Sequence, residues 1–344
     1  MVRKQRRTTL EDVARKAGVS MMTVSRVINH TGRISDATRQ RVFEVIEQLD
    51  YRPNRAARTL VTNKTFMVAL VQPDITNPYF AEMFRGVEDV LRPEDYRVLV
   101  ANSNETPARE QEILEMLDDT TIDGLIICSS RLPDSDLLPL LERFSCVVAT
   151  TRALPEPIGS VVHSDYAPGY RAVIGFRYLH EQGYRRIGYL RLQHYDIYVD
   201  IKTFQRDLAK LGIQLKDEWT RACAPQWQAG YDAGYDLLKT QPELQAIIGG
   251  NDLVALGAMR AALDLGRTIP DDLGVIGADD ILLASQVTPP LTTLKTNAYA
   301  VGSMAAQLLL RRMGGDMTYR EHVYTTELIV RGSTRSLLED GDKE

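Results

Sequence analysis

Three short runs of apolar residues recur at helical spacing between residues 9 and 50. Apolar positions three or four residues apart mark one buried face in each run, and polar residues fill the positions between them. The pattern therefore predicts three short helices that pack on one another. The apolar positions are Val13, Ala14 and Ala17, then Val24 and Val27, then Val42, Val45, Ile46 and Leu49.

Capping residues set the limits of these helices. Thr9 followed by Asp12 is a capping box for the first helix, and Ser20 and Ser35 can cap the second and third. Gly18 suits the tight turn between the first two, because glycine adopts positive φ at no steric cost. An ordinary helical hairpin is the alternative, but these small residues favour a DNA-reading helix-turn-helix. The solvent-facing side of its second helix carries Met21, Met22, Ser25 and Arg26.

From Phe66 onward the pattern changes to short β-rich runs that alternate with helical ones. Repeated strand–helix alternation predicts parallel sheets with helices on both faces, and two such series predict two lobes. The first series has strands at 66–73, 96–102, 124–130 and 146–151, with helices near 78–92, 107–121 and 134–143. The second has strands at 187–192, 246–250 and 274–279, with helices near 166–182, 198–211, 228–240 and 251–266.

Residues 51–63, YRPNRAARTLVTN, connect the two patterns. Pro53 ends the preceding helix, and Asn54 can cap a short basic helix that contains Ala56, Ala57 and Leu60. A bland linker is usually richer in Gly, Ser or acidic residues. The composition instead favours a segment that folds against DNA.

Charge is distributed unevenly along the chain. Residues 1–62 contain 13 Lys and Arg against 6 Asp and Glu, a net +7, so the remainder carries −12 of the total of −5. A small basic head on an acidic body is expected of a module that meets phosphates. The chain contains no run of 18 apolar residues and no apolar segment typical of a secretion signal, and its three separated cysteines suit buried reduced thiols. We therefore expect a cytoplasmic protein with no membrane segment.

Ligands of open α/β sheets bind beyond the carboxyl ends of the strands. The residues that follow the expected strands are therefore site candidates, and all could face one cleft between the lobes. They are Asn77 to Phe80, Thr151 and Arg152, the 191–200 loop, Asn251 with Asp252, and Asp279 with Asp280.

Enzymatic motifs are missing from the sequence. It has no GxSxG, P-loop, HExxH or GxGxxG, and its five histidines do not cluster with a nucleophile. The pair Asp279 and Asp280 could be read as a general acid and base, but a carboxylate that accepts ligand hydroxyls, or a solvated loop, fits a strand end better. We expect no catalytic residues, no metal ligands and no cofactor.

Several motifs in order resemble the LacI-type (lactose repressor) family of bacterial transcription regulators. They are LEDVARKAGVSMMTVSRVIN, YRPNRAARTL, GYRRIGYL, NDLVALGAMRA, GADD and PPLTTLKT, and the resemblance covers roughly residues 8–335. It implies a multidomain fold, with an all-α helix-turn-helix head and an α/β periplasmic-binding-protein-like body of two doubly wound parallel-sheet lobes.

The resemblance also implies domain limits, with three chain crossings between the lobes near 163, 292 and 322. The head is expected at 1–50 and a hinge helix and linker at 51–64. The N-terminal lobe is expected at 65–163 plus 293–321, the C-terminal lobe at 164–292 plus 322–335, and a short acidic tail at 336–344.

The resemblance assigns DNA-binding roles. Met21, Met22 and Arg26 match the positions that read base edges, where Arg26 can donate two bonds to guanine and methionine can contact thymine methyls; packing near DNA is the alternative for the methionines. Leu60 matches the hinge residue that wedges into the minor groove, with burial against its own domain as the alternative. The full expected set is Thr9, Ser20, Met21, Met22, Thr23, Ser25, Arg26, Asn29, Arg55, Ala57, Arg58 and Leu60.

For the cleft, the resemblance implies a small carbohydrate-derived effector. Tyr79 and Phe80 would stack on it, with a core position as the alternative for either ring, and Asn251 and Asp279 would bind its hydroxyls. Two residues depart from the family pattern: Asp200, or Lys202 if the gap slides, stands where an arginine is usual, and Thr151 stands where aspartate is common. The expected set is Asn77, Tyr79, Phe80, Thr151, Arg152, Asp200, Asn251 and Asp279.

The expected partners follow from symmetry. One helix-turn-helix reads a half-site, so a palindromic double-stranded operator requires a homodimer. The tail SLLEDGDKE has no leucine heptads that would form a tetramer. The expected function is an effector-gated, DNA-binding repressor, and the alternative is a cytoplasmic solute sensor whose head makes protein contacts.

Overall fold

The structure is a computed structural model that describes residues 8–28, 32–51, 64–117, 120–152, 154–155, 158–164, 170–193 and 200–335. The chain divides into two compact units, residues 1–65 and residues 66–344. The expected hinge residues from 52 to 63 and the tail 336–344 lie outside the described residues.

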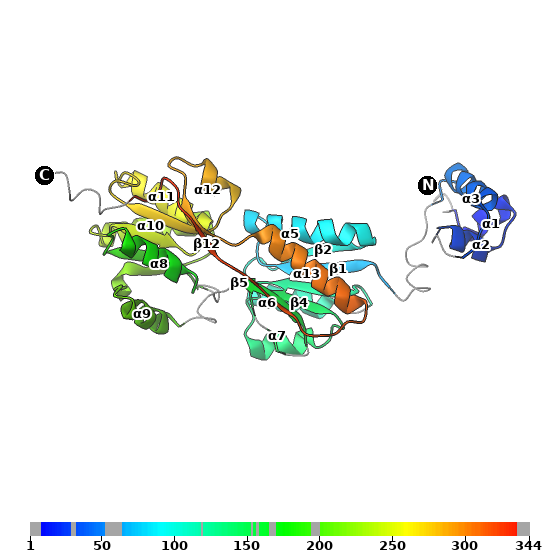
Figure 1. The fold of residues 1–344 in the computed structure, drawn as a ribbon, viewed down its shortest axis with the longest axis horizontal. Helices are drawn as coiled ribbons and strands as arrows, with labels where there is room; N and C mark the ends of the chain where they lie inside the picture. Colours follow the sequence, from blue (N-terminus) through cyan, green and yellow to red (C-terminus); the bar gives the residue numbers. More distant parts are fainter. Residues whose placement is uncertain are drawn as a thin grey trace, which may run out of the picture. The chain divides into compact units, whose positions relative to one another are not determined.

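In residues 8–28 and 32–51 of the first unit, three short helices pack on one another (Figure 1), and their core consists mainly of valine and alanine side chains. The predicted capping box is present: Thr9 N–H donates to the Asp12 carboxylate at 3.0 Å, and Asp12 N–H donates to the Thr9 hydroxyl. Gly18 ends the first helix with φ at 66°, the left-handed conformation that the sequence predicted. The helices are α1 (Leu10–Ala17), α2 (Met21–Ile28) and α3 (Asp36–Gln48).

The second unit contains two six-stranded sheets, which we call the first and second lobes after their order in the chain. The first sheet is parallel throughout and has the order β11-β5-β4-β3-β1-β2. Its strands are β1 (Met67–Gln72), β2 (Arg97–Asn102), β3 (Gly124–Cys128), β4 (Val147–Thr150), β5 (Ser160–Ser164) and β11 (Glu321–Tyr324). Its helices are α5 (Pro78–Leu91), α6 (Pro107–Met116), α7 (Asp134–Leu141) and α13 (Ala298–Met313), with the 3-10 turn η1 (Arg92–Glu94).

The second sheet has the order β12-β10-β9-β8-β6-β7 and is parallel except for β12, which runs antiparallel to β10. Its strands are β6 (Ile187–Leu192), β7 (Thr220–Cys223), β8 (Ala246–Gly249), β9 (Gly274–Asp279), β10 (Thr292–Lys295) and β12 (Glu327–Ile329). Its helices are α8 (Ala172–Glu181), α9 (Ile201–Lys210), α10 (Trp227–Thr240), α11 (Asp252–Asp264) and α12 (Leu282–Gln286), with the 3-10 turn η3 (Asp217–Trp219).

Side chains alternate between the two faces of the first sheet, so each strand feeds two cores. In β1, Val68 and Leu70 pack in the core that holds residues of α5 and α13. Ala69 and Val71 pack instead with residues of α6 and α7. Helices therefore cover both faces of the sheet, and the doubly wound fold predicted from the alternation is confirmed.

Two of the expected crossings between lobes lie a few residues from their predicted places. We expected the chain to return to the first lobe at 293, but β10 pairs with β9 in the second sheet, with Thr292 opposite Ile276. We also expected it to leave the first lobe after 321, but β11 pairs with β5, with Val323 opposite His163. Backbone pairing thus places these crossings after residues 295 and 324, and the expected limits were wrong by about one strand.

Candidate effector cleft and nucleic-acid interface

The second helix of the head presents the side chains that the sequence singled out. Met21 and Met22 are 53% and 63% exposed, and Arg26 is exposed, whereas Val24 and Val27 on the opposite side are buried. Two exposed thioethers on a bundle this small are unusual, because apolar side chains of this size normally pack in the core. α2 therefore has one packed face and one free face.

Of the other expected DNA-binding residues, Ser20, Thr23 and Ser25 lie at the start of α2 or within it, and Thr9 lies at the start of α1. The Ser20 hydroxyl accepts from Thr23 N–H at 3.1 Å, which confirms Ser20 as the cap, and Thr9 is exposed beside the start of α1. Thr23 and Ser25 are half-buried. A helix start with its amides near the surface is a natural place for a phosphate. The remaining members of the set lie outside the described residues: Asn29, Arg55, Ala57, Arg58 and Leu60.

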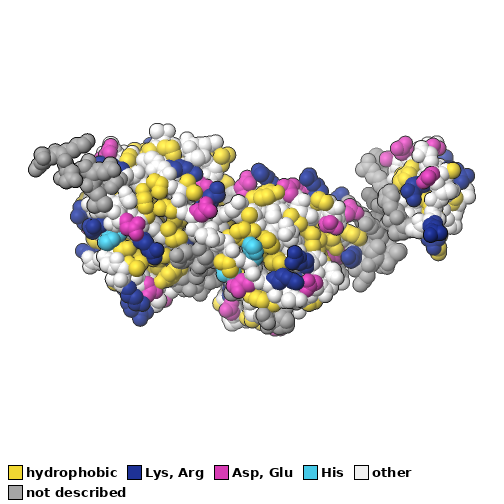
Figure 2. All heavy atoms as spheres, in the orientation of Figure 1, with side chains coloured by type: hydrophobic (Ala, Val, Ile, Leu, Met, Phe, Trp, Pro, Cys, Tyr) yellow, Lys and Arg dark blue, Asp and Glu magenta, His cyan; other side chains and the backbone are white. Residues whose placement is uncertain are grey.

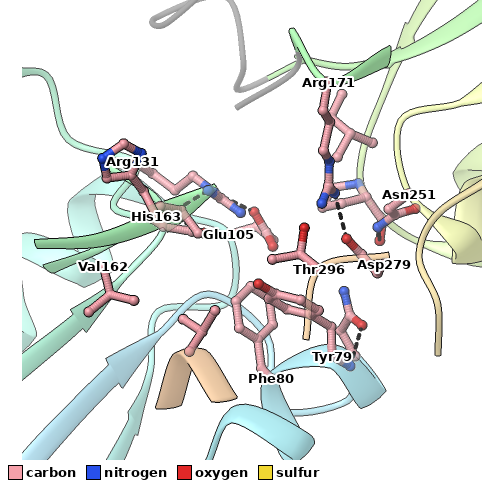
Figure 3. A pocket seen from close by; sticks show the side chains of 16 residues that line it. Tyr79, Phe80, Glu105, Arg131, Val162, His163, Arg171, Asn251, Asp279 and Thr296 are labelled. Atoms are coloured by element: carbon pink, nitrogen blue, oxygen red, sulfur yellow. Dashed lines mark hydrogen bonds and ion pairs between the residues drawn. The ribbon is translucent and has the colours of Figure 1, made fainter. Parts of the chain in front are cut away.

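A cavity that is partly open to solvent lies in the second unit, where the carboxyl ends of the two sheets face each other. Figure 3 shows Arg131, Glu105 and His163 on one side of it, Arg171, Asn251 and Asp279 on the other, and Tyr79 and Phe80 below. Residues of both lobes line it: Asn77, Tyr79, Phe80, Glu105, Ser129, Arg131, Thr151, Val162, His163, Arg171, Leu192, Pro225, Asn251, Asp279, Thr296 and Val301.

The aromatic side of the cavity is fixed by the start of α5. The Asn77 side chain accepts from Tyr79 N–H at 3.0 Å, and Pro78 occupies the first turn, which suits its fixed φ. The rings of Tyr79 and Phe80 pack edge to face at 82°, with centroids 5.4 Å apart. Both belong to the hydrophobic core and also line the cavity. Each ring can therefore belong to the core and contact a ligand at the same time.

A buried ion pair stands on the first-lobe side. Arg131 Nε donates to Glu105 Oε2 at 2.6 Å, and its Nη1 donates to the Ser129 carbonyl at 2.6 Å. The side chains are only 4% and 14% exposed. Below them the carboxylate of Glu110 accepts from Arg131 N–H at 2.8 Å, and burial raises the pKa of Glu110. Glu110 therefore fixes the loop that carries Arg131.

A second buried ion pair stands on the second-lobe side. Arg171, just before α8, donates through Nη2 to Asp279 Oδ1 at 2.5 Å, and the side chains are 11% and 8% exposed. Burial raises the pKa of Asp279, and the Arg171 charge opposes that shift. Asn251 is held by backbone: its Oδ1 accepts from Val254 N–H at 2.9 Å and its Nδ2 donates to the Pro225 carbonyl at 3.1 Å. Asn251 is therefore mainly a cap for α11, with one N–H left for a ligand.

Four of the residues that line the cavity have a strained backbone conformation. Glu105, Ser129 and Thr151 have φ of 60°, 46° and 67°, and Asp279 has φ of 120°. All four lie after or at the end of a strand and line the cavity. Non-glycine residues in such conformations cost about 1–3 kcal/mol each and recur at ligand sites. The strain turns these side chains toward one space.

Two expected site residues do not line the cavity. Arg152 donates to the Leu132 carbonyl and to Asp134, so its guanidinium is used within the first lobe. Asp200 is exposed and caps α9 by accepting from Thr203 N–H at 2.9 Å, and its alternative, Lys202, pairs with Asp217 at 2.6 Å. Neither Asp200 nor Lys202 is among the described residues that line the cavity. Thr151 does line the cavity, and its hydroxyl lies 2.7 Å from the Ser129 hydroxyl.

Several lining residues were absent from the expected set. They include Glu105, which follows β2, and Ser129 and Arg131, which follow β3. The expectation that ligands bind beyond the carboxyl ends of strands also applies to these two strands and would have predicted all three residues. Arg171 stands just before α8 rather than at the end of a strand, so this expectation does not find it, and its contact with Asp279 brings it to the cavity.

Other chemistry is limited within the described residues. No group of three or more His, Cys, Asp and Glu side chains among them is arranged to hold a metal ion, and none of their helices has the length and apolar content to cross a membrane. Cys128, Cys146 and Cys223 are buried free thiols, as predicted. Burial raises the pKa of Cys128 to about 12 and of Cys223 to about 11, which keeps them protonated and unreactive.

Known proteins resemble the chain along nearly its whole length. Residues 9–54 match the family described as bacterial regulatory proteins, lacI family, and residues 176–334 match the periplasmic binding protein-like domain. The HTH-type transcriptional repressor PurR of Mannheimia succiniciproducens is 31% identical, over 96% of this chain and 99% of its own. The ribose operon repressor of Halalkalibacterium halodurans is 33% identical, over 95% and 97%. The structure of the regulator CelR in complex with cellobiose superimposes with a TM-score of 0.67 at 29% identity, over 95% and 100%.

Proposed function

The chain belongs to the lacI family of bacterial regulatory proteins, and we propose that it is a repressor that binds an operator through α2 and responds to a small carbohydrate-derived effector. The observation that carries the proposal is the free face of α2, where Met21, Met22 and Arg26 are exposed on a packed bundle. An α-helix fits the major groove, where arginine can pair with guanine and thioethers can contact thymine methyls.

The charge division supports this role. The net +7 of residues 1–62 suits contact with phosphates, while the remainder carries −12. On the face of the second unit seen in Figure 2, basic and acidic side chains are interspersed, and no single-sign stripe tracks across it. In this proposal nucleic acid binds the basic head, and the protein is cytoplasmic.

The operator is palindromic and the protein a homodimer in this proposal. One α2 has eight residues and contacts one half of the operator. The α2 of a second protomer, related to the first by a twofold axis, contacts the other half. Leu60 and the flanking Arg55, Ala57 and Arg58 form the hinge that enters the minor groove between the two heads. Leu60→Ala is expected to weaken operator binding more than binding to random DNA. Equal losses on both DNAs would refute the proposal that Leu60 inserts between base pairs of the operator.

The cavity is the effector site. Asn77, Tyr79, Phe80, Thr151, Asn251 and Asp279 line it, and its two sides come from different lobes. A ligand that contacts both sides changes the balance between open and closed arrangements of the lobes. Effector and operator affinities are then linked, and each changes the other by the same factor.

The test uses the full chain and an operator fragment that the chain itself selects from random DNA. Binding is measured at two salt concentrations, with and without D-ribose, D-glucose, cellobiose, nucleosides and sugar acids. We expect salt-sensitive binding to the selected fragment that one class of compound alters. Failure to select any sequence would refute the repressor and favour a solute sensor whose head contacts protein, and turnover of a bound compound would refute a purely regulatory role.

A further inference from the structure

The chain passes between the two lobes after β10 and again after β11. β10 pairs within the second sheet, whereas α13, the next helix, packs against β3, β4 and β5 of the first. β11 pairs within the first sheet, whereas β12, the next strand, pairs with β10 in the second. The two crossings are short, since they consist of residues 296–297 and residues 325–326. The backbone must therefore bend at or beside these residues if one lobe turns against the other.

Asp280 contacts the second-lobe side of both crossings. Its Oδ1 accepts from Arg331 Nη2 at 2.5 Å, and its Oδ2 lies 3.6 Å from Lys295 Nζ. Lys295 is the last residue of β10, directly before one crossing, and Arg331 follows β12, which begins directly after the other. The side chains of Asp280 and Arg331 are only 12% and 19% exposed. Solvent ions therefore screen this pair less than they would screen a surface ion pair.

Arg331 also binds the start of β10. Its backbone N–H donates to the Thr292 hydroxyl at 2.9 Å, and its Nη1 donates to the Leu291 carbonyl at 2.9 Å. The guanidinium is planar, so its contacts with Asp280 and with Leu291 fix its orientation together. One side chain thus joins the Asp280 carboxylate to the two strands that lead to the crossings.

Asp280 is also joined directly to the effector cavity, because the residue before it, Asp279, lines that cavity. Both residues have positive φ, 120° for Asp279 and 56° for Asp280, which leaves this backbone few other conformations. The next residue is held as well, since Ile281 N–H donates to the Asp252 carboxylate on α11 at 2.8 Å. A ligand that displaces Asp279 must therefore also move Asp280 and its contacts.

We propose that Asp280 is a positioning residue that couples the effector cavity to the angle between the lobes. It does so without contact to the effector, because it is not among the described residues that line the cavity. Its carboxylate passes a movement of Asp279 to Lys295 and Arg331, and these two residues hold the ends of the crossings. This inference rests on the proposed function and adds the means by which the cavity regulates operator binding.

A purely structural role for Asp280 would have a different consequence. An ion pair that only stabilises the fold lowers the melting temperature when it is removed. It leaves unchanged the factor by which the effector alters operator affinity in either direction, which we call the coupling factor. Both affinities in this ratio belong to folded protein, so a loss of stability does not change it. The coupling factor therefore separates positioning from stabilisation.

Asp280→Asn tests the inference, because it removes the charge at nearly constant volume and asparagine tolerates positive φ. Operator titrations on the full chain, without ligand and with saturating D-ribose, D-glucose, cellobiose or adenosine, give the coupling factor. The wild type is expected to have a factor of about 5–150 with one of these compounds. Asp280→Asn should lower that factor about threefold or more, and should change the dissociation constant of the same compound for the free protein less than about twofold.

Asp236→Asn is the control for loss of an ion pair within the second lobe. Asp236 on α10 pairs with Arg221 on β7 at 2.7 Å, and neither residue belongs to a strand that leads to a crossing. Its coupling factor should equal that of the wild type. An equal reduction in Asp236→Asn and Asp280→Asn would show a general effect of lost charge and would overturn the inference.

Arg331→Gln removes the same ion pair from the other side and replaces Asp280→Asn if that variant does not fold. Each variant should lower the coupling factor, and the double variant should lower it no further than the stronger of the two, since both lose one shared contact. Reductions that multiply in the double variant would show that the two residues act separately, and would contradict the proposed link.

Two failures can be told apart in this experiment. A wild type that responds to a compound, with the same coupling factor in Asp280→Asn and Arg331→Gln, would overturn the inference and leave the effector-gated repressor intact. Operator binding by the wild type that none of the compounds alters would refute the effector half of the proposed function, and the inference with it.

Discussion

Gly86 in α5 and Gly302 in α13 lie where these two helices cross. A Cβ atom on Gly86 would stand 2.1 Å from the Tyr299 carbonyl oxygen, and one on Gly302 would stand 2.1 Å from the Met83 carbonyl oxygen. Backbone atoms cannot move aside as a flexible side chain can, so the crossing requires glycine on both helices.

The second lobe uses the same device. Where α10 and α11 cross, a Cβ on Gly230 would lie 2.4 Å from the Val254 carbonyl oxygen, and one on Gly257 would lie 2.2 Å from that of Trp227. Each lobe thus brings two helices into backbone contact on one side of its sheet. Helices this close act as one rigid block, which suits lobes that move relative to each other as bodies.

Gly302→Ala is expected to destabilise the first lobe. Alanine would favour an isolated helix by about 1 kcal/mol, but overpacking against backbone costs roughly 1–3 kcal/mol or more, so the packing effect wins. Thermal unfolding should show a melting temperature several degrees below that of the wild type.

Gly314→Ala is the matched control, because the atoms nearest to its Cβ are 3.3 Å away. Its melting temperature should stay close to the wild-type value. A Gly302→Ala protein as stable as Gly314→Ala would mean that the two helices can separate without cost, and the rigid block would be rejected.

Arg26 is expected to supply sequence discrimination. A bidentate arginine–guanine pair contributes about 1–3 kcal/mol of discrimination against a wrong base. Arg26→Ala should therefore weaken binding to the selected operator by roughly tenfold or more and weaken binding to random DNA much less. Titrations of both DNAs at one salt concentration measure the two effects.

Arg15→Ala serves as the control for lost charge, since Arg15 is exposed on α1 and pairs there with Glu11 and Asp12. It should lower both affinities slightly and equally. Arg26→Ala with the same equal loss would show that Arg26 contacts only phosphate.

The exposed thioethers predict sensitivity to oxidation. Hydrogen peroxide converts methionine to its sulfoxide, a polar group that cannot make apolar contact with thymine methyls. Treated wild-type protein should lose operator affinity, and methionine sulfoxide reductase should restore it. Peptide mass spectrometry would report the oxidation of Met21 and Met22 alongside the affinity.

A variant with both Met21→Leu and Met22→Leu keeps the apolar contact and should bind the operator equally well before and after peroxide. Met116 and Met317, which are 73% and 48% exposed, remain oxidisable in it and control for damage elsewhere. Loss of affinity in this variant would place the sensitive methionine outside the reading face.

Much of the fold was predictable because its central strands are buried on both faces. β6 and β9 begin and end at the predicted residues, since nearly every position in them is apolar. β7 and β12 escaped prediction because they are short, half-exposed edge strands with no clear alternation. Their positions depend on pairing with distant residues, which a local pattern does not contain.

The same distinction between local pattern and distant contact applies to the residues of the candidate site. Asn77, Thr151 and Asp279 were found because the ends of parallel strands share one edge of a sheet. Arg171 was missed because its role depends on Asp279, 108 residues away. Asp200 caps α9 and is not among the described residues that line the cavity, a difference that matching a family position without coordinates cannot reveal. Residues placed by topology were predictable, and those placed by tertiary contacts were not.

Asp252 predicts a pH dependence of stability in the second lobe. The residue is fully buried, and its carboxylate accepts from Ile281 N–H at 2.8 Å and from the Thr293 hydroxyl. Burial, together with the nearby charge of Asp279, raises its pKa to about 7. Because the folded-state pKa lies above that of the unfolded chain, the stabilisation is complete below about pH 4 and is lost as pH rises through about 7. The wild type should therefore melt at a lower temperature at about pH 8.5 than at about pH 5.5.

Asp252→Asn should remove this pH dependence without loss of the hydrogen bonds. The Asn oxygen can accept from Ile281 N–H, and its NH₂ can donate to the Thr293 hydroxyl, which rotates to accept. The variant should have similar melting temperatures at both pH values and exceed the wild type at the higher one, where the wild type holds a buried charge that costs several kcal/mol to form. Thr293→Val is the companion variant, because it keeps the carboxylate and removes a donor, so its melting temperature should fall more steeply with pH than that of the wild type. Parallel pH profiles for the wild type and Asp252→Asn would show that Asp252 does not titrate in this range.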